Sequence, residues 1–321
     1  MIAFGCPITD AGAYERWAEP GIGRAAEADS VVLAESSPGS IFQAYNALCD
    51  RVAGQDDLEA LVLLHQDAEL VDPDFCQRIR GALADPEVAI VGCAGAVGVR
   101  SIAWWDGQIT WARYTHVFGE MGGGELPGLS WSDPPPPGAR TGEVDSIDGL
   151  VIVMSPWAVR ELRFDESLGN LHGYDLDICL QARAAGRKVV TADFRVVHHH
   201  SLDLIGDREG WIQAHMRIAD KWSETLDPEG ENDWESRARR ARAEADSESV
   251  YLRLAQHHIT RLSEDFHQME NSRSWKLTAP LRALGRLGRR IRGKPPGRQL
   301  GEGVVRPGSA AGLPPAERPP S

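Results

Sequence analysis

Several features that define other classes of protein are scarce or absent in this sequence. Cysteine occurs five times in 321 residues, widely spaced and without a Cys-x-x-Cys pair. That pattern argues against a disulfide framework or a zinc site and favours small core residues. No run approaches the roughly 20 apolar residues that span a bilayer, and Met1–Gly5 leads into an apolar strand without a basic leader. We therefore expect a cytoplasmic protein.

Positive charge is scarce in most of the chain and concentrated near its end. The formal net charge is −13, yet residues 271–321 carry 11 Lys and Arg against 2 Asp and Glu, which gives +9 there and −22 elsewhere. An acidic body is a poor surface for nucleic acid, so we expect no nucleic-acid partner. The basic end is the part suited to an anionic membrane or another acidic partner.

Short apolar segments alternate with segments of helical pattern in the first third of the chain. Strands of this spacing, separated by helices, indicate βαβ units and a parallel sheet covered on both faces. A hydrophobic content of 42% supports a real core. The pattern predicts a doubly wound α/β domain, with strands over residues 2–5, 31–34, 61–64 and 88–92 and helices over about 11–28, 40–52 and 74–84.

Polar residues follow two predicted strands at the point where each strand ends. His65-Gln66-Asp67 follows the apolar strand 61–64, and His198-His199-His200 follows a predicted strand over 188–197. Open α/β sheets bind ligands at this edge, and a carboxylate such as Asp67 suits a divalent cation because hard cations prefer oxygen ligands. The alternative is that Asp67 only caps the next helix.

Two further segments carry polar or aromatic residues that suit ligand binding. Between residues 95 and 141, Trp104, Trp105 and Trp111 lie among Gly and Pro; Trp can stack on a sugar face, whereas the alternative is a poorly ordered insertion. The helix predicted over 172–186 begins with two aspartates, at 175 and 177. Acids in a first turn are favoured by the helix dipole, so one of these has only a structural role.

Three further segments, over residues 227–271, 272–292 and 293–321, follow the domain predicted over 1–226. A helix up to residue 271 carries apolar residues at 3-4-3-4-3 spacing, which indicates either packing onto the preceding domain or self-association as a homodimer. Residues 272–292 resemble a basic amphipathic helix that lies on a membrane surface, and 293–321 are predicted to be disordered. The apolar stripe is Leu252, Ala255, Ile259, Leu262, Phe266 and Met269.

Taken in order, seven blocks of this sequence resemble the GT-A-fold, family-2-like glycosyltransferases, within them the streptomycin-biosynthesis type. The resemblance implies a doubly wound, mostly parallel sheet of the nucleotide-diphospho-sugar transferase kind. The blocks are Ile41–Asn46, His65–Asp67, Val91–Gly95, Asp148–Gly149, Phe164–Glu166, His172–Asp177 and Lys221–Trp222.

The resemblance also implies a cation site and a catalytic base. His65-Gln66-Asp67 resembles a D-x-D motif with His in place of the first acid, so Asp67 would bind a Mn²⁺ or Mg²⁺ that bridges the donor diphosphate. His198 resembles a late histidine that joins the cation or diphosphate. Tyr174-Asp175 aligns with an E-D motif, which makes Asp175 the base; a single base of this kind predicts inversion at C1 of the sugar.

Binding residues follow from the same resemblance. The donor is expected to contact the ends of the first strands and the motif after the third, and the acceptor is expected near the second acidic motif and the tryptophans. The expected donor contacts are Pro7, Glu35, Tyr45, Asn46, His65 and Gln66, and the expected acceptor contacts are Asp148, Gly149, Trp104, Trp105 and Tyr174.

The leading hypothesis is an inverting, nucleotide-sugar-dependent glycosyltransferase of cell-surface polysaccharide or glycoconjugate assembly, with a glycan or lipid-linked acceptor. Residues 274–282 resemble a segment that recurs beside bacterial glycosyltransferase domains and fit an enzyme at the inner face of the membrane. The main alternative is a non-catalytic nucleotide-sugar or glycan-binding module, suggested by His65. A nucleotidyltransferase would require a Gly-rich basic loop after the first strand, which Gly5–Asp10 is not.

Overall fold

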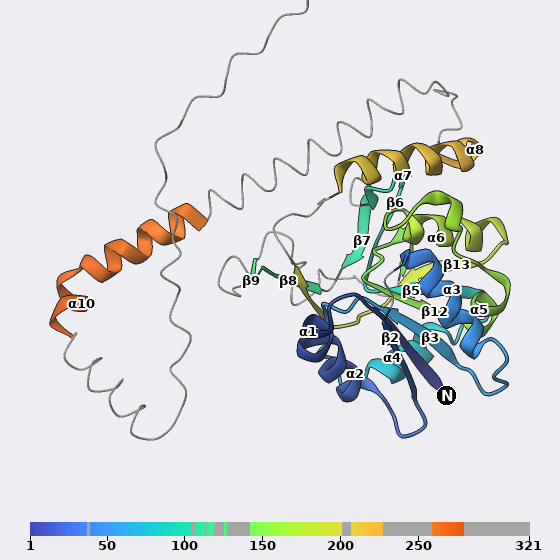
Figure 1. The fold of residues 1–321 in the computed structure, drawn as a ribbon, viewed down its shortest axis with the longest axis horizontal. Helices are drawn as coiled ribbons and strands as arrows, with labels where there is room; N and C mark the ends of the chain where they lie inside the picture. The colour runs from blue at the N-terminus through green and yellow to red at the C-terminus, as the bar shows by residue number, and fades with distance from the viewer. Residues whose placement is uncertain are drawn as a thin grey trace, which may run out of the picture. The chain divides into compact units, whose positions relative to one another are not determined.

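The computed structural model describes residues 1–36, 39–104, 107–112, 114–118, 125–126, 142–200, 207–226 and 259–278. The chain divides into two compact units, Met1–His257 and His258–Ser321, and each is described by itself. Figure 1 shows the first unit as helices arranged around twisted strands.

A seven-stranded sheet forms the centre of the first unit, in the order β10-β13-β5-β12-β3-β1-β2. β1 lies parallel to β2 and β3, and β5 lies parallel to β13. β12 runs antiparallel between β3 and β5, and β10 is antiparallel at the edge. The predicted mixed α/β class with a mostly parallel sheet is confirmed. The bounds are β1 Ile2–Ile8, β2 Val31–Ser36, β3 Ala60–Leu64, β5 Val88–Gly92, β10 Gly142–Glu143, β12 Val151–Met154 and β13 Lys188–Thr191.

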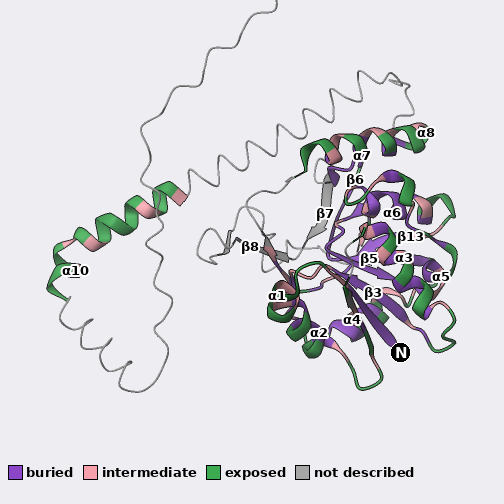
Figure 2. Cartoon of the chain, viewed as in Figure 1, coloured by how far each residue is buried: buried purple, intermediate pink, exposed green. Residues whose placement is uncertain are grey.

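Helices cover both faces of this sheet, as the neighbours of two adjacent β1 residues show. The ring of Phe4 lies 6.3 Å from that of Phe75 in α4, whereas the backbone at Gly5 lies against Leu48 of α3. Adjacent strand residues point to opposite faces, so α3 and α4 lie on opposite sides. Figure 2 shows the central strands buried and the outer helix surfaces exposed. The bounds are α3 Ile41–Val52, α4 Phe75–Ala82, α5 Pro156–Glu161 and α6 Tyr174–Ala184.

The helix predicted over residues 11–28 consists of three consecutive segments. These are α1 (Ala11–Ala13), a π-helical turn (Tyr14–Ala18) and α2 (Glu19–Ala25). Asp10 caps the first segment by accepting hydrogen bonds from the backbone N–H groups of Gly12 and Ala13. The π-helical turn changes the direction of the side chains within a stretch whose apolar spacing alone predicts one continuous helix.

Two smaller sheets complete the unit. One has the order β11-β6-β7 and the other β4-β14-β8-β9. The predicted strand over 188–197 is wrong as a single element: β13 ends at Thr191 in the central sheet, and β14 belongs to the second small sheet. The bounds are β4 Ala68–Leu70, β6 Ala94–Val97, β7 Gln108–Ala112, β8 Tyr114–Phe118, β9 Glu125–Leu126, β11 Ser146–Ile147 and β14 Val196–His200.

A buried polar network ties α6 to the end of α7 (Arg208–Lys221) and to Trp222, which lies between α7 and α8 (Ser223–Leu226). The carboxylate of Asp177 is fully buried and accepts hydrogen bonds from Gln181 (2.7 Å) and from the indole of Trp222 (2.7 Å). Lys221 pairs with the same carboxylate at 2.8 Å and with Asp165 at 2.7 Å. A third segment, the 3₁₀ turn Glu166–Leu168, is thereby joined to the two helices.

The described part of the second unit is helical. Residues 259–271 form a helix, and Ser272 caps the short helix α10 (Arg273–Leu277) by accepting from the backbone of Trp275. Leu262, Phe266 and Met269 of the apolar stripe are exposed, while Leu252 and Ala255 lie outside the described residues, as do the predicted limits at residues 227, 292 and 293. Among the helices that the structure describes, none has the length and apolar character that a bilayer crossing requires.

Candidate active site

Strand direction brings two segments distant in sequence to one edge of the central sheet. β12 is antiparallel to β3, so its beginning lies beside the carboxyl end of β3, where Val151 pairs with Leu64. The backbone N–H of His65 donates to the carbonyl of Leu150 at 3.2 Å. The motif that follows β3 therefore lies next to Asp148-Gly149, which precedes β12.

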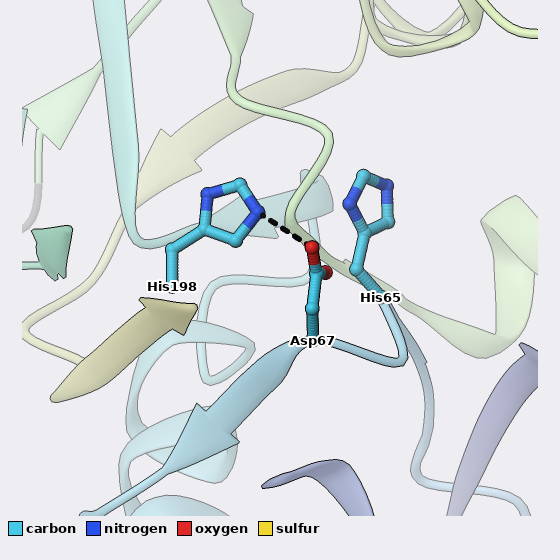
Figure 3. A group of neighbouring side chains, drawn as sticks. All are labelled: His65, Asp67 and His198. Atoms are coloured by element: carbon cyan, nitrogen blue, oxygen red, sulfur yellow. Dashed lines mark ion pairs between the residues drawn. The ribbon is translucent and has the colours of Figure 1, made fainter. Parts of the chain in front are cut away.

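His65, Asp67 and His198 form a cluster suited to a cation. One possible ligand atom from each lies within 4.8 Å of the others, and Nε2 of His198 is 3.5 Å from Oδ2 of Asp67 (Figure 3). Two atoms bound at about 2.1 Å to one ion lie roughly 3 to 4 Å apart, so this pair fits a shared ion. The donor set, two imidazoles and one carboxylate, suits a divalent transition metal.

Backbone pairing places Asp67 and His198 opposite each other. β4 begins directly after Asp67 and runs antiparallel to β14, where His198 is the register partner of Ala68. The N–H of His199 donates to the carbonyl of Asp67 at 2.9 Å. The ladder between β4 and β14 therefore sets the distance between the two side chains before any ion binds.

The ring of His65 contacts Tyr174 on its other side. Nε2 of His65 lies 2.6 Å from the phenol oxygen of Tyr174. Burial lowers the pKa of His65, although the Asp67 carboxylate opposes this shift. A neutral imidazole retains a lone pair, which is the form that binds a metal.

Asp175 follows Tyr174 in the first turn of α6. Burial, followed by repulsion from Asp148, raises the pKa of the Asp175 carboxyl to about 7, even though the backbone N–H groups of Leu176 and Gly149 lower it. The Leu176 N–H donates to Oδ1 of Asp175 at 2.9 Å. A carboxyl group with a pKa near the working pH is ionised in a large fraction of the molecules and still has a high affinity for a proton. A general base requires both properties.

Tyr174 is held in place from several directions. It is 6% exposed, and its ring meets Phe42 and Tyr45 edge-on at centroid distances of 6.0 and 5.6 Å. A Cβ atom at position 149 would overlap the phenol oxygen, so only glycine fits there. Position 149 is therefore a glycine because the phenol of Tyr174 occupies the space that a side chain would need.

Gln66, the middle residue of the motif after β3, points toward the loop after β1. Its Oε1 accepts hydrogen bonds from the backbone N–H groups of Thr9 and Asp10, both at 2.8 Å, and its Nε2 donates to Thr9 Oγ1 at 2.9 Å. Pro7, half-buried near the end of β1, is the register partner of Glu35 in β2. Gln66 thus anchors the backbone beside two of the predicted donor contacts.

Three residues predicted to touch ligands contact other groups of the protein instead. Tyr45 is fully buried and packs against Phe164 at 5.1 Å between ring centroids, and Trp104 is 3% exposed. Asn46 exchanges two hydrogen bonds of 2.9 Å with the backbone of Phe164. The structure does not bring these three side chains to a ligand surface, and Trp105 lies outside the described residues.

One residue beside the cluster, Trp17, carries no signal in the sequence that points to the site. Its ring stacks on that of His199 at 3.4 Å between centroids and 7° between planes. Nε2 of His199 lies 3.0 Å from Oε2 of Glu69. His198 and His199 therefore face different groups, as the alternation of side chains along a strand predicts.

The glycosyltransferase-like family model matches residues 22–205, and the chain belongs to that family. The predicted resemblance is confirmed at this level.

Two proteins of known biosynthetic systems resemble this chain in sequence. The chain is 29% identical over 210 residues to the streptomycin biosynthesis protein StrF of Streptomyces griseus, a match that covers 63% of this chain and 67% of StrF. It is 28% identical over 180 residues to the O-antigen biosynthesis protein RfbC of Myxococcus xanthus, with 52% of this chain but only 13% of RfbC covered.

Among solved structures, the mannosyltransferase PcManGT of Pyrobaculum calidifontis, in complex with GDP-Man and Mn²⁺, is 13% identical to this chain. The match covers 88% of this chain and 84% of PcManGT, with a TM-score of 0.41. That score is too low to establish a common fold, so the family assignment rests on sequence.

Proposed function

We propose that this protein is an inverting glycosyltransferase that moves a sugar from a nucleotide-diphosphate donor to a hydroxyl acceptor. The observation that carries the proposal is the raised pKa of Asp175, about 7, in a carboxylate whose neighbour Tyr174 contacts His65 of the cation cluster at 2.6 Å. A base and a site for the leaving diphosphate are thus separated by one side chain. Family membership supplies the general activity.

Asp175 acts on the acceptor in this proposal. The carboxylate takes the proton of the acceptor hydroxyl while the hydroxyl oxygen forms a bond to C1 of the donor sugar. The bond between C1 and the diphosphate oxygen breaks on the opposite face, which inverts C1 and releases the nucleoside diphosphate. The negative charge of Asp148, which raises the pKa of Asp175, increases the proton affinity of the base.

Asp67 and His198 are the residues that would hold a divalent cation, Mn²⁺ or Mg²⁺ in the family pattern, at the donor end of the site. When bound, such an ion neutralises charge on the leaving diphosphate. The support in this chain is the 3.5 Å separation of Nε2 of His198 and Oδ2 of Asp67. Pro7, Glu35 and Gln66 remain the proposed donor contacts near the end of β1, and Asp148 remains the proposed acceptor contact.

A panel of nucleotide sugars tests the enzyme against a non-catalytic binding module. The matched pair is Asp175→Asn and Asp85→Asn; Asp85 precedes β5 at the other edge of the sheet and pairs with Lys188 at 2.9 Å. We expect Asp175→Asn to lose transfer and donor hydrolysis while it still binds the nucleotide diphosphate. Asp85→Asn should keep transfer, donor hydrolysis and nucleotide binding. Nucleotide binding without turnover in the wild type across the panel would favour the binding module.

The biological setting is also proposed. A role in cell-surface polysaccharide or glycoconjugate assembly, on a glycan or lipid-linked acceptor in the cytoplasm, is supported by the name of the relative RfbC, an O-antigen biosynthesis protein. StrF is named for streptomycin biosynthesis, so a small-molecule acceptor is the other outcome. Assays with lipid-linked and soluble acceptors separate the two.

Membrane contact through 272–292 and a homodimer through the apolar stripe complete the proposal. Their support is the basic charge of the tail and the exposure of Leu262, Phe266 and Met269, at 59%, 38% and 44%. Truncation after Met269 is expected to release the protein from anionic vesicles without loss of donor hydrolysis.

Replacement of Leu262 and Phe266 by Ser is expected to convert a dimer into a monomer in light scattering. Equal masses of wild type and variant would remove the dimer from the proposal.

A further inference from the structure

His65 presents its two ring nitrogens to two different groups. Nε2 lies 2.6 Å from the phenol oxygen of Tyr174. Figure 3 shows the other nitrogen, Nδ1, on the side of Asp67 and His198, with which His65 forms the group of possible ligand atoms within 4.8 Å. The ring is therefore oriented by one contact and directed at the cation cluster by the other.

The orientation is imposed by the packing around Tyr174. The phenol ring cannot swing away, because Phe42 and Tyr45 meet it edge-on and the backbone of Gly149 lies directly against its oxygen. A side chain 6% exposed at the start of a helix is a rigid support. Metal-binding histidines are commonly held by a hydrogen bond to the nitrogen that does not bind the metal, which fixes both ring angle and tautomer.

We propose that His65 is a third cation ligand through Nδ1, and that Tyr174 is the positioning residue that directs Nδ1 at the ion. Coordination by Nδ1 requires the proton to be on Nε2, where it is donated to the oxygen of Tyr174. The site then has two imidazoles and one carboxylate. This donor set favours Mn²⁺, Co²⁺, Ni²⁺ and Zn²⁺ over Mg²⁺, whose preferred ligands are oxygens.

The assignment replaces the predicted nucleotide contact of His65. The role of the ion in sugar transfer rests on the proposed function. The binding of the ion can be measured by itself, without a donor or an acceptor. Cation affinity and transfer are therefore separate readouts.

The test is a titration of the full-length protein with Co²⁺, followed by visible absorption and by calorimetry, and repeated with Mn²⁺, Zn²⁺ and Mg²⁺ with and without UDP or GDP. The variants are His65→Gln and Tyr174→Phe, with His267→Gln and Tyr14→Phe as matched controls; His267 belongs to the second unit and Tyr14 to the π-helical turn. Far-ultraviolet circular dichroism confirms that each variant is folded.

We expect Co²⁺ to bind the wild type at least ten-fold more tightly than Mg²⁺. His65→Gln should weaken Co²⁺ binding about 10- to 100-fold and change the absorption spectrum, and Tyr174→Phe should weaken it about 10-fold or more, as is typical of a residue that orients a ligand. The controls should match the wild type. Asp67→Asn should abolish binding.

Several results would overturn the inference. Wild-type Co²⁺ affinity and an unchanged spectrum in His65→Gln, with binding lost in Asp67→Asn, would leave a cation site without His65 and would leave the proposed function intact. Equal affinity for Mg²⁺ and Co²⁺, or no cation binding by the wild type with either nucleotide, would also overturn it. Intact Co²⁺ binding with no transfer from any donor would instead refute the proposed function alone.

A second measurement covers variants that fail to fold. Nitrogen-15 shifts of the histidine rings in the wild type, recorded with and without Zn²⁺, report the tautomer directly. We expect a proton on Nε2 of His65 and a Zn²⁺-dependent shift at Nδ1. A proton on Nδ1 in the Zn²⁺-loaded protein would overturn the inference.

Discussion

The indole of Trp222 donates a hydrogen bond of 2.7 Å to the carboxylate of Asp177, two residues after Asp175 in the same helix. Gln181 and Lys221 contact that carboxylate as well, so three side chains of the protein occupy it. Asp175 accepts instead from backbone N–H groups and has a raised pKa. The two acids at the start of α6 therefore have different surroundings: Asp177 belongs to a network that holds the fold together, and Asp175, the proposed base, does not.

Replacement of Asp177 should reduce stability. Asp177→Ala leaves the indole N–H of Trp222 without its acceptor and Lys221 without its buried partner, which should cost about 2–4 kcal/mol of unfolding free energy. Urea denaturation measures the loss. Asp50→Ala is the control, because that acid pairs with Arg163 at the protein surface, and a loss below about 1 kcal/mol is expected. Similar losses in both variants would contradict the structural role of Asp177.

Asp175→Asn should stabilise the protein while it removes activity. The pKa of this carboxyl is about 7 in the folded chain against 3.8 when free, so below about pH 4 both states are protonated and the group contributes nothing. As pH rises from 4 to 7 the unfolded state ionises first, and the folded state loses stability. We expect the variant to exceed the wild type by about 1–3 kcal/mol at pH 8 and by less at pH 4. A less stable variant at pH 8 in urea denaturation would contradict this.

The rate of transfer should depend on the ionisation of the same group. With a pKa of about 7, kcat/KM should rise with pH below 7, by up to ten-fold per unit, and level off above it, because only the carboxylate accepts the acceptor's proton. Initial rates from pH 5 to 8.5 at saturating cation test this. A flat profile over that range would remove Asp175 as the base.

Gly149→Ala should impair both stability and transfer. The added Cβ overlaps the phenol of Tyr174, and the displaced ring would no longer support His65; we expect a stability loss of about 1–3 kcal/mol and a fall in kcat. Gly23→Ala is the matched control, because a Cβ added there in α2 would have no neighbour within 4 Å and alanine favours a helix. Equal behaviour of the two variants in thermal unfolding and transfer assays would show that Tyr174 tolerates displacement.

The parallel strands were predictable because each is a short apolar run between turn residues. Val151–Met154 is equally apolar, but an apolar run carries no sign of its direction, and only the structure shows it antiparallel between β3 and β5. The break after Thr191 was also missed, since both halves of 188–197 have strand-like residues. Hydrophobic periodicity does not report a change of sheet.

Single candidate residues of the site could be named from the sequence, but their contacts with one another could not. Strand ends marked Asp67 and the histidine run, whereas the choice of His198 and Asp175 came from the family resemblance. Tyr45 and Trp104 were predicted at ligand surfaces and are buried. An aromatic side chain that stacks on a sugar and one that fills a core have the same signature in a single sequence. His65 and Tyr174 each depart from the family pattern, and their contact at 2.6 Å is visible only in three dimensions.

The pairing of β4 with β14 decides which of the consecutive histidines faces Asp67. His198 stands opposite Ala68, and a shift of one residue would turn its ring to the other face while His199 took its place, because the two histidines are adjacent in the chain. The stacking of His199 on Trp17 and its contact with Glu69 exist only in the present alignment. Those two contacts on the opposite face therefore select between neighbouring histidines that the sequence alone leaves equivalent.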